Sequence, residues 1–177
     1  MGQRRDFTAI AVVERRENQW AGARELVLRY LERMPLGTPY TKVVERLRTM
    51  MRHPEMAGRT RMVVDATGVG APVVEMLRSA GVSAIAVTIT GGAQAHGQGE
   101  HWHVPRRDLL AGLEVLLEAG DLKISRRLAE AERLVRELTA LRTRGGGGEH
   151  DNLVMAVALA CWRARERGWG FGTRRLI

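Results

Sequence analysis

The sequence predicts an α/β protein in which helices flank a mixed sheet, and three features carry this prediction. The first is a strand, a helix and a second strand over residues 62–89, the order typical of a parallel βαβ unit. The second is a pair of largely apolar stretches at 7–14 and 25–33, which indicates an antiparallel hairpin. The third is a helix from Leu153 onward that is apolar nearly all round, as a helix buried against a sheet would be.

Length and composition limit the class of protein. The 177 residues suit one domain over 1–177, with 168–177 as a tail. No apolar run approaches the roughly 18 residues that a membrane span needs, and the chain starts without a secretory leader. The single cysteine, Cys161, cannot form an internal disulfide. We therefore expect a protein of a reducing, cytoplasmic compartment.

Net charge favours an anionic partner. Lys and Arg number 28 against 20 Asp and Glu, which gives a formal net charge of +8, and most of the positive charge is arginine. The planar guanidinium donates paired hydrogen bonds to phosphate, so this composition favours a polyanion over a small metabolite. The alternative is an arginine-rich surface that serves only solubility.

The first predicted helix follows the hairpin after a short break. Thr38 followed by Pro39 is the order of an N-cap and a first helical residue. Apolar residues then recur at helical spacing from Tyr40 to Met51, and we expect the helix to end before Pro54.

The stretch Asp65–Gly70, reading Asp-Ala-Thr-Gly-Val-Gly, is the first candidate site. Residues 62–64 form a short apolar strand, and Asp65 stands where it gives way to a Gly-x-Gly turn before a helix over 71–80, closed by Gly81. The carboxyl ends of strands form the ligand-binding edge of open α/β sheets. Asp65 is therefore a candidate ligand-binding residue, and the alternative is that it only caps the helix.

We expect residues 91–103 to form an exposed loop between a strand over 82–89 and a helix that starts at Pro105. They are rich in Gly, Gln and His and show no periodicity. Three histidines lie there: His96, His101 and His103. A His-x-His pair in a glycine-rich loop lacks the rigid element and further ligands of a structural metal site, so we favour a plain loop.

The C-terminal half predicts two more helices and a short strand. A leucine stripe indicates a helix from Pro105 to just before Gly120, and residues 122–124 suit an edge strand. Ser125 is the expected cap of the next helix. Its expected buried residues are Leu128, Leu134, Val135, Leu138 and Leu141.

A second carboxylate follows a basic, glycine-rich stretch at 142–148, which predicts a flexible loop. Asp151 lies in the first turn of the last helix, which would bring it to the sheet edge. If Asp151 meets Asp65, the two acids offer the hard oxygen ligands that Mg²⁺ or Mn²⁺ requires. Two such ions can drive phosphodiester hydrolysis. The neighbouring Glu149 and His150 are interpreted as exposed cap residues.

Five groups of residues, in chain order, carry a resemblance to a known family. They are Gly2-Gln3 with Asp6-Phe7-Thr8-Ala9-Ile10-Ala11-Val12, Pro35-Leu36-Gly37-Thr38-Pro39-Tyr40, Asp65-Ala66-Thr67-Gly68-Val69-Gly70, Val104-Pro105 with Arg107-Asp108-Leu109, and His150-Asp151-Asn152-Leu153-Val154-Met155-Ala156 with Ala158-Leu159-Ala160. Together they resemble the RNase H-like nuclease domain at the C-terminal end of the large terminase subunit of tailed bacteriophages.

The resemblance implies a function and a site. That family cuts concatemeric viral DNA during genome packaging, using three acidic positions that bind divalent metal. It implies that Asp65 is the second acid and that Asp151, beside Asn152, supplies the third, with Mg²⁺ or Mn²⁺ as cofactor. The implied partners are double-stranded DNA, the portal protein and the small terminase subunit, in the cytoplasm of a bacterial host. We assign DNA contacts to four arginines, for which a merely solvated face is the alternative: Arg106, Arg107, Arg142 and Arg144.

The chain departs from the family pattern at two places. It begins at the turn Met1-Gly2-Gln3, so the family's first strand and first acid are missing, and Asn152 stands where the family usually has another acid. We therefore expect an RNase H-like sheet without its first strand, and an exposed strand edge at Phe7 that invites self-association. An upstream segment is expected to supply the strand and an ATPase, since no Gly-x-x-x-x-Gly-Lys-Ser/Thr loop occurs in the sequence.

Three other interpretations stay open. One is another RNase H-like nuclease, such as a Holliday-junction resolvase. Another is a nucleotide-binding fold built on Asp65, Gly68 and Gly70, although Val73 stands where the third glycine of that motif would be. The last is a DNA-binding or scaffolding module without catalysis.

Overall fold

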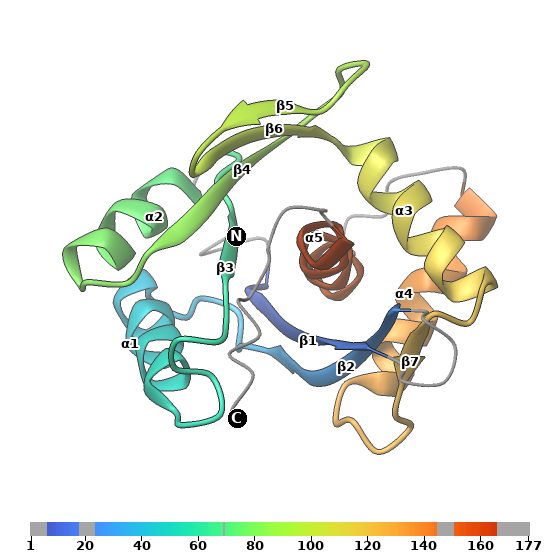
Figure 1. Cartoon of the computed structure of the whole chain (residues 1–177), viewed down its shortest axis with the longest axis horizontal. Helices are drawn as coiled ribbons and strands as arrows, with labels where there is room; N and C mark the ends of the chain where they lie inside the picture. Colours follow the sequence, from blue (N-terminus) through green and yellow to red (C-terminus); the bar gives the residue numbers. More distant parts are fainter. Residues whose placement is uncertain (1–6, 18–23, 69, 145–150, 166–177) are drawn as a thin grey trace, which may run out of the picture.

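The computed structural model describes residues 7–17, 24–68, 70–144 and 151–165. Over these ranges the protein consists of two mixed sheets flanked by five helices (Figure 1). The predicted α/β class is confirmed. None of these helices is long and apolar enough to cross a membrane.

The first sheet contains the predicted hairpin. β1 (Ala9–Glu17) pairs antiparallel with β2 (Arg24–Arg33), and the register shifts between Val12 and Val13. β7 (Leu122–Ile124) adds to β2 in parallel and forms one edge of the sheet, as predicted. The order β1-β2-β7 leaves β1 as the other edge.

The second sheet has the order β3-β4-β6-β5, so β3 is an edge strand. β3 (Met62–Asp65), α2 (Gly70–Ser79) and β4 (Ala84–Thr90) form the predicted parallel βαβ unit. The predicted closing glycine, Gly81, has φ 73°, a backbone conformation that glycine adopts readily.

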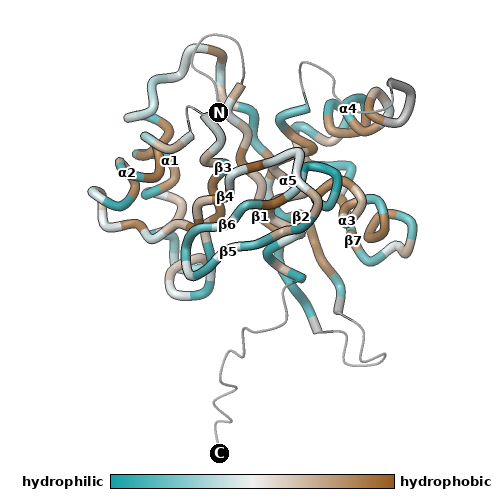
Figure 2. The backbone as a smooth tube through the Cα atoms, turned by 90° about the horizontal axis from the view of Figure 1, so that it is seen from above, coloured by the Kyte–Doolittle hydropathy of each residue, from teal (hydrophilic) through white to brown (hydrophobic). Residues whose placement is uncertain are grey.

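The prediction of an exposed loop over residues 91–103 is wrong. Much of it forms β5 (His96–Gln98) and the start of β6 (His101–Pro105), which pair antiparallel, while β6 also lies parallel to β4. β5 is exposed and hydrophilic throughout (Figure 2). Backbone pairing with β6 therefore holds this strand, and a search for apolar periodicity could not reveal it.

Helix α1 (Tyr40–Arg52) has the predicted extent, but its expected cap is wrong. Pro39 occupies the N-cap position and no side chain caps the helix. The Thr38 hydroxyl instead donates to the Pro35 carbonyl at 2.6 Å. Thr38 thus stabilises the turn before the helix.

Helix α4 (Ala131–Arg144) differs from the prediction at both ends. Ser125 does not cap it, because its hydroxyl accepts the amide of Arg127 at 3.2 Å in a preceding turn. Val135 was expected in the core but is 59% exposed. The helix also continues through residues 142–144, which were predicted as loop, whereas 145–148 and the tail 168–177 lie outside the described residues.

Two clusters of buried side chains fill opposite faces of the second sheet. β4 divides them: Ile85 and Val87 join one cluster, and Ala84 and Ala86 join the other. α1 and α2 cover the alanine side, while α3 (Arg106–Glu118) and α5 (Asn152–Arg165) contribute to the cluster on the other side.

Helix α5 lies at the centre of the molecule and contacts both sheets (Figure 1). Its nearly continuous apolar character was predicted and is confirmed. The buried residues are Leu153, Val154, Met155, Val157, Ala158, Leu159 and Cys161. Because α5 packs against β1, β2 and β3, it connects two sheets that share no strand.

Candidate functional site

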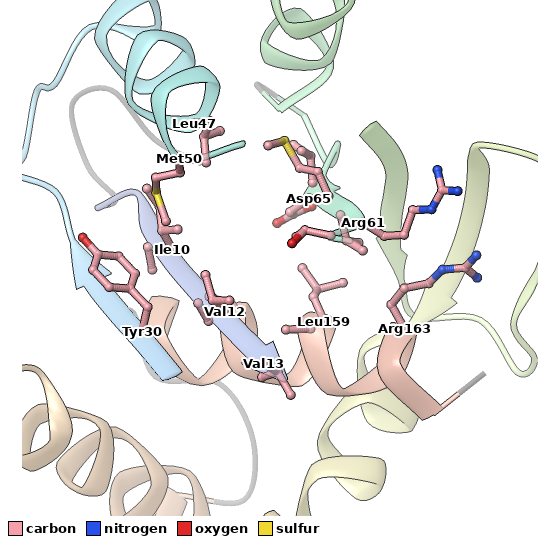
Figure 3. A pocket seen from close by; sticks show the side chains of 18 of the residues that line it. Ile10, Val12, Val13, Tyr30, Leu47, Met50, Arg61, Asp65, Leu159 and Arg163 are labelled. Atoms are coloured by element: carbon pink, nitrogen blue, oxygen red, sulfur yellow. The ribbon is translucent and has the colours of Figure 1, made fainter. Parts of the chain in front are cut away.

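A groove of about 1340 Å³ separates the edges of the two sheets. Residues 7–15 line one side and residues 61–65 line the other. β1 and β3 therefore face each other across the groove without pairing. Figure 3 shows Ile10, Val12 and Val13 of β1 on one side of the groove and Leu159 of α5 beside them.

Asp65 ends β3 and lines this groove. Its Oδ1 accepts the amide hydrogen of Thr67 at 2.9 Å, so the carboxylate is held in a tight turn and is not bonded to an amide of α2 in this arrangement. The turn needs its glycines. Gly68 has φ +55°, and a Cβ on Gly70 would lie 1.9 Å from the Asp65 carbonyl oxygen.

Thr67 fixes the turn to the neighbouring strand. Its hydroxyl oxygen accepts the amide hydrogen of Ile89 at 2.8 Å, close to the carboxyl end of β4. Sequence reasoning gave Thr67 no role of its own, although a hydroxyl inside the Asp65–Gly70 stretch was an available signal. Thr67 and Ile89 also line the groove, so this contact helps to set the direction of Asp65.

Asp151 reaches the same edge of the second sheet through Arg106. β3, β4 and β6 run parallel, so Asp65 and Pro105 both stand at carboxyl ends. Arg106 follows Pro105, and its guanidinium forms an ion pair with the Asp151 carboxylate. The Asp151 carbonyl accepts the amide of Met155 at 2.9 Å, which begins α5. The side chain of Asp151 is only 17% exposed.

The structure thus brings four of the predicted site residues to one groove: the predicted metal ligands Asp65, Asp151 and Asn152, and Arg106. Two carboxylates and an amide oxygen are hard donors of the kind that Mg²⁺ and Mn²⁺ prefer. Over the part of the chain that is described, no group of three or more His, Cys, Asp or Glu side chains converges as a metal site. Glu149 and His150 lie outside that part.

Glu137 of α4 is a buried carboxylate that supports the start of α5. It is 9% exposed, and its Oε2 accepts the amide hydrogens of Leu153 at 2.9 Å and Val154 at 3.2 Å. Burial raises the pKa of Glu137, against the opposing effect of these two hydrogen bonds. Glu137, a residue of α4, thus caps the N-terminal end of α5. The sequence did contain a signal for this role, which was not recognised: Glu137 lies on the same helical face as Leu134 and Leu138.

The four predicted DNA-binding arginines do not form one set. The Arg106 side chain is 33% exposed and is paired with Asp151. Arg107 is 68% exposed; it contacts Asp108 at 3.3 Å and donates to the Ala93 carbonyl. The side chains at positions 142 and 144 lie outside the described part of the structure.

The histidines of β5 and β6 pair with other groups. His96 and His103 are opposite each other in the ladder, and their rings stack with centroids 5.0 Å apart. His101 Nε2 lies 2.9 Å from a guanidinium nitrogen of Arg78. Each of the three histidines thus has a partner within the second sheet or on α2.

Comparison of the chain with models of protein families, with curated proteins and with solved structures found no match.

Proposed function

We propose that this protein is a metal-dependent nuclease domain with an RNase H-like fold, of the type found in phage terminase large subunits, and that it hydrolyses phosphodiesters of double-stranded DNA. One observation carries the proposal. Asp65 and Asp151, which are 86 positions apart (65 to 151), line one groove at the carboxyl edge of parallel strands. Ligand sites of open α/β sheets lie at that edge.

The residues present fit a hard divalent cation. The carboxylates of Asp65 and Asp151 and the amide oxygen of Asn152 would hold Mg²⁺ or Mn²⁺. When bound, such ions supply a Lewis acid and an activated water. The turn through Thr67 orients Asp65, and Arg106 both orients Asp151 and places a positive charge beside the groove, where a DNA phosphate would bind.

The proposed substrate follows from charge. The net charge of +8 and the exposed Arg107 suit a polyanion that extends beyond the groove. As part of the same proposal, the protein acts in the bacterial cytoplasm with the portal protein and the small terminase subunit as partners.

The test is cleavage of supercoiled plasmid DNA in Mg²⁺ or Mn²⁺ by the full chain and by two variants, Asp65→Asn and Asp151→Asn. Each variant should lose about 100-fold or more of the rate, because each removes an anionic ligand. Asp121→Asn is the matched control, since Asp121 is exposed and does not line the groove. Cleavage that survives Asp65→Asn would overturn the assignment.

A non-catalytic DNA-binding module is the second candidate, and the ion pair between Arg106 and Asp151 favours it, because the pair neutralises one of the two carboxylates. This candidate predicts salt-dependent DNA binding without cleavage in either metal. Calorimetric titration with Mn²⁺ separates the two candidates independently of DNA. The nuclease requires Mn²⁺ binding that Asp65→Asn weakens.

A further inference from the structure

Arg106 occupies one of the two carboxylates that would bind the cation. Its guanidinium pairs with Asp151, and both residues line the groove. The Asp151 side chain is only 17% exposed, and a carboxylate that is largely removed from water needs a positive charge beside it. Arg106 supplies that charge in this structure. A cation on either oxygen of Asp151 would lie close to the guanidinium, so the two positive charges would repel each other.

Asp65 is held in a different way. Its Oδ1 accepts the neutral amide of Thr67 at 2.9 Å, a contact that leaves the negative charge of the carboxylate in place. Figure 3 shows the Asp65 side chain at the groove. The two candidate ligands are therefore unequal, because this contact leaves the charge of Asp65 to a cation, whereas the charge of Asp151 is already balanced by Arg106.

The candidate metal site is also short of acidic ligands. Over the described ranges, no third His, Cys, Asp or Glu side chain joins Asp65 and Asp151 in a metal-binding group. Hard cations such as Mg²⁺ are commonly held by one or two carboxylates together with phosphate oxygens of the substrate. A DNA phosphate in the groove would supply such oxygens. The cation and the phosphate would thus each complete the binding site of the other.

The Arg106 side chain can exchange Asp151 for a phosphate. Arg106 is the first residue of α3, and its side chain is 33% exposed. A second contact joins its guanidinium to the Met155 sulfur at 3.3 Å, and a thioether is a weak acceptor. A phosphate offers the guanidinium the same paired acceptor geometry as a carboxylate. Arg106 would therefore keep a charged partner when it turns from Asp151 to DNA.

We propose that Arg106 is a positioning residue that couples the binding of the cation to the binding of DNA. Without DNA, Arg106 pairs with Asp151 and opposes the cation. When a DNA phosphate enters the groove, the guanidinium pairs with that phosphate, and Asp151 becomes available to the cation. By linkage, the cation raises the affinity for DNA by the same factor. The proposal rests on the proposed nuclease function and adds that the metal site is completed only on bound DNA.

The experiment measures Mn²⁺ binding to the full chain with and without a short DNA duplex. Free Mn²⁺ is followed by its electron paramagnetic resonance signal at low temperature, where cleavage is slow, and the Mn²⁺ taken up by the duplex alone is subtracted. The variant is Arg106→Gln. The matched control is Arg107→Gln, which removes the same charge from the neighbouring residue, an exposed arginine that does not line the groove.

Without DNA, Arg106→Gln should bind Mn²⁺ about tenfold more tightly than the unchanged chain does. The duplex should then raise the Mn²⁺ affinity of the unchanged chain about tenfold more than it raises that of Arg106→Gln. Arg107→Gln should behave like the unchanged chain. Fluorescence anisotropy of a labelled duplex tests the reciprocal effect, since Mn²⁺ should raise the affinity for the duplex by the same extra factor.

Three results would contradict the proposal, and they differ in what they mean for the proposed function. Weaker Mn²⁺ binding in Arg106→Gln, with or without DNA, would give Arg106 a structural role only. If the duplex changes the Mn²⁺ affinity equally in the unchanged chain and in Arg106→Gln, Arg106 does not couple the two ligands, although the nuclease proposal stands. If none of the chains binds Mn²⁺ with or without the duplex, the proposed function fails as well.

Discussion

At the scale of single residues, Gly70 decides the geometry of the candidate site. A Cβ there would meet the carbonyl oxygen and carbon of Asp65 at 1.9 and 2.8 Å, which are backbone atoms that cannot rotate away. The turn that carries Asp65 can therefore form only with glycine at this position.

Gly70→Ala should destabilise the protein by about 1–3 kcal/mol, because the added methyl group must push the Asp65–Gly70 turn apart. Gly91→Ala is the control, since nothing lies within 4 Å of a Cβ at Gly91, and it should stay within about 0.5 kcal/mol. Urea unfolding measures both. Equal stability of the two variants would mean that the turn is not as close as the structure shows.

The ion pair with Arg106 occupies the carboxylate of Asp151. Arg106→Gln should strengthen Mn²⁺ binding about tenfold, equivalent to about 1.4 kcal/mol, because the guanidinium no longer competes with the cation for Asp151. Calorimetric titration provides the measurement, with Arg107→Gln as the exposed control. An unchanged affinity in Arg106→Gln would exclude Asp151 as a ligand.

At the scale of secondary-structure elements, the start of α5 depends on α4. The first amides of a helix have no partner within the helix. Glu137 accepts two of them from a buried position, and so connects the packing of α4 to the place where Asp151 and Asn152 enter the groove. A disturbance at Glu137 should therefore affect both stability and the candidate site.

Glu137→Ala should lower the free energy of unfolding by about 2–4 kcal/mol, because it leaves two buried amides without an acceptor. Glu132→Ala, in the exposed first turn of the same helix, serves as the control and should change stability by about 0.5 kcal/mol or less. Denaturant titrations at pH 7 compare them. A small effect at Glu137 would show that water replaces the cap.

The pH dependence of stability should carry the signature of Glu137. Burial raises its pKa above the ordinary value of 4.5, so the folded protein binds this proton more tightly than the unfolded chain does. The resulting stabilisation is complete below the pKa of the unfolded chain and is lost as pH rises through the pKa of the folded protein. Glu137→Gln should therefore flatten the decline in stability with pH just above 4.5, as measured by urea unfolding at successive pH values.

At the scale of the whole molecule, α5 connects the two sheets. The reactivity of Cys161, a residue of α5, measures how firmly this helix is held. Burial raises the pKa of the Cys161 thiol to about 12, and the residue is 1% exposed in the larger core cluster. The thiol should react with a disulfide reagent at pH 8 only when the protein unfolds, since the reactive thiolate is scarce and enclosed. The rate of the thiol reaction should increase with urea concentration in parallel with global unfolding. A rate insensitive to low urea would mean that α5 detaches locally.

The sequence predicted local structure best where a periodic apolar pattern existed. The hairpin, the βαβ unit, α3 and the buried α5 each carry such a pattern and were confirmed. The β5–β6 pair carries none, because the exposed β5 is held by backbone pairing with β6, which needs no apolar pattern. The caps at Thr38 and Ser125 were wrong because a hydroxyl stabilises a turn as readily as a helix end.

The sequence by itself determined the hairpin, the βαβ unit, the position of Asp65 at a strand end, and the apolar character of α5, because these follow from neighbours a few residues apart. Only the tertiary structure decided that Arg106 pairs with Asp151, that Glu137 caps another helix, and that β1 and β3 stand apart across a groove. The reason is physical. These contacts join residues far apart in the chain, and their existence depends on how the sheets pack around α5 rather than on any local pattern.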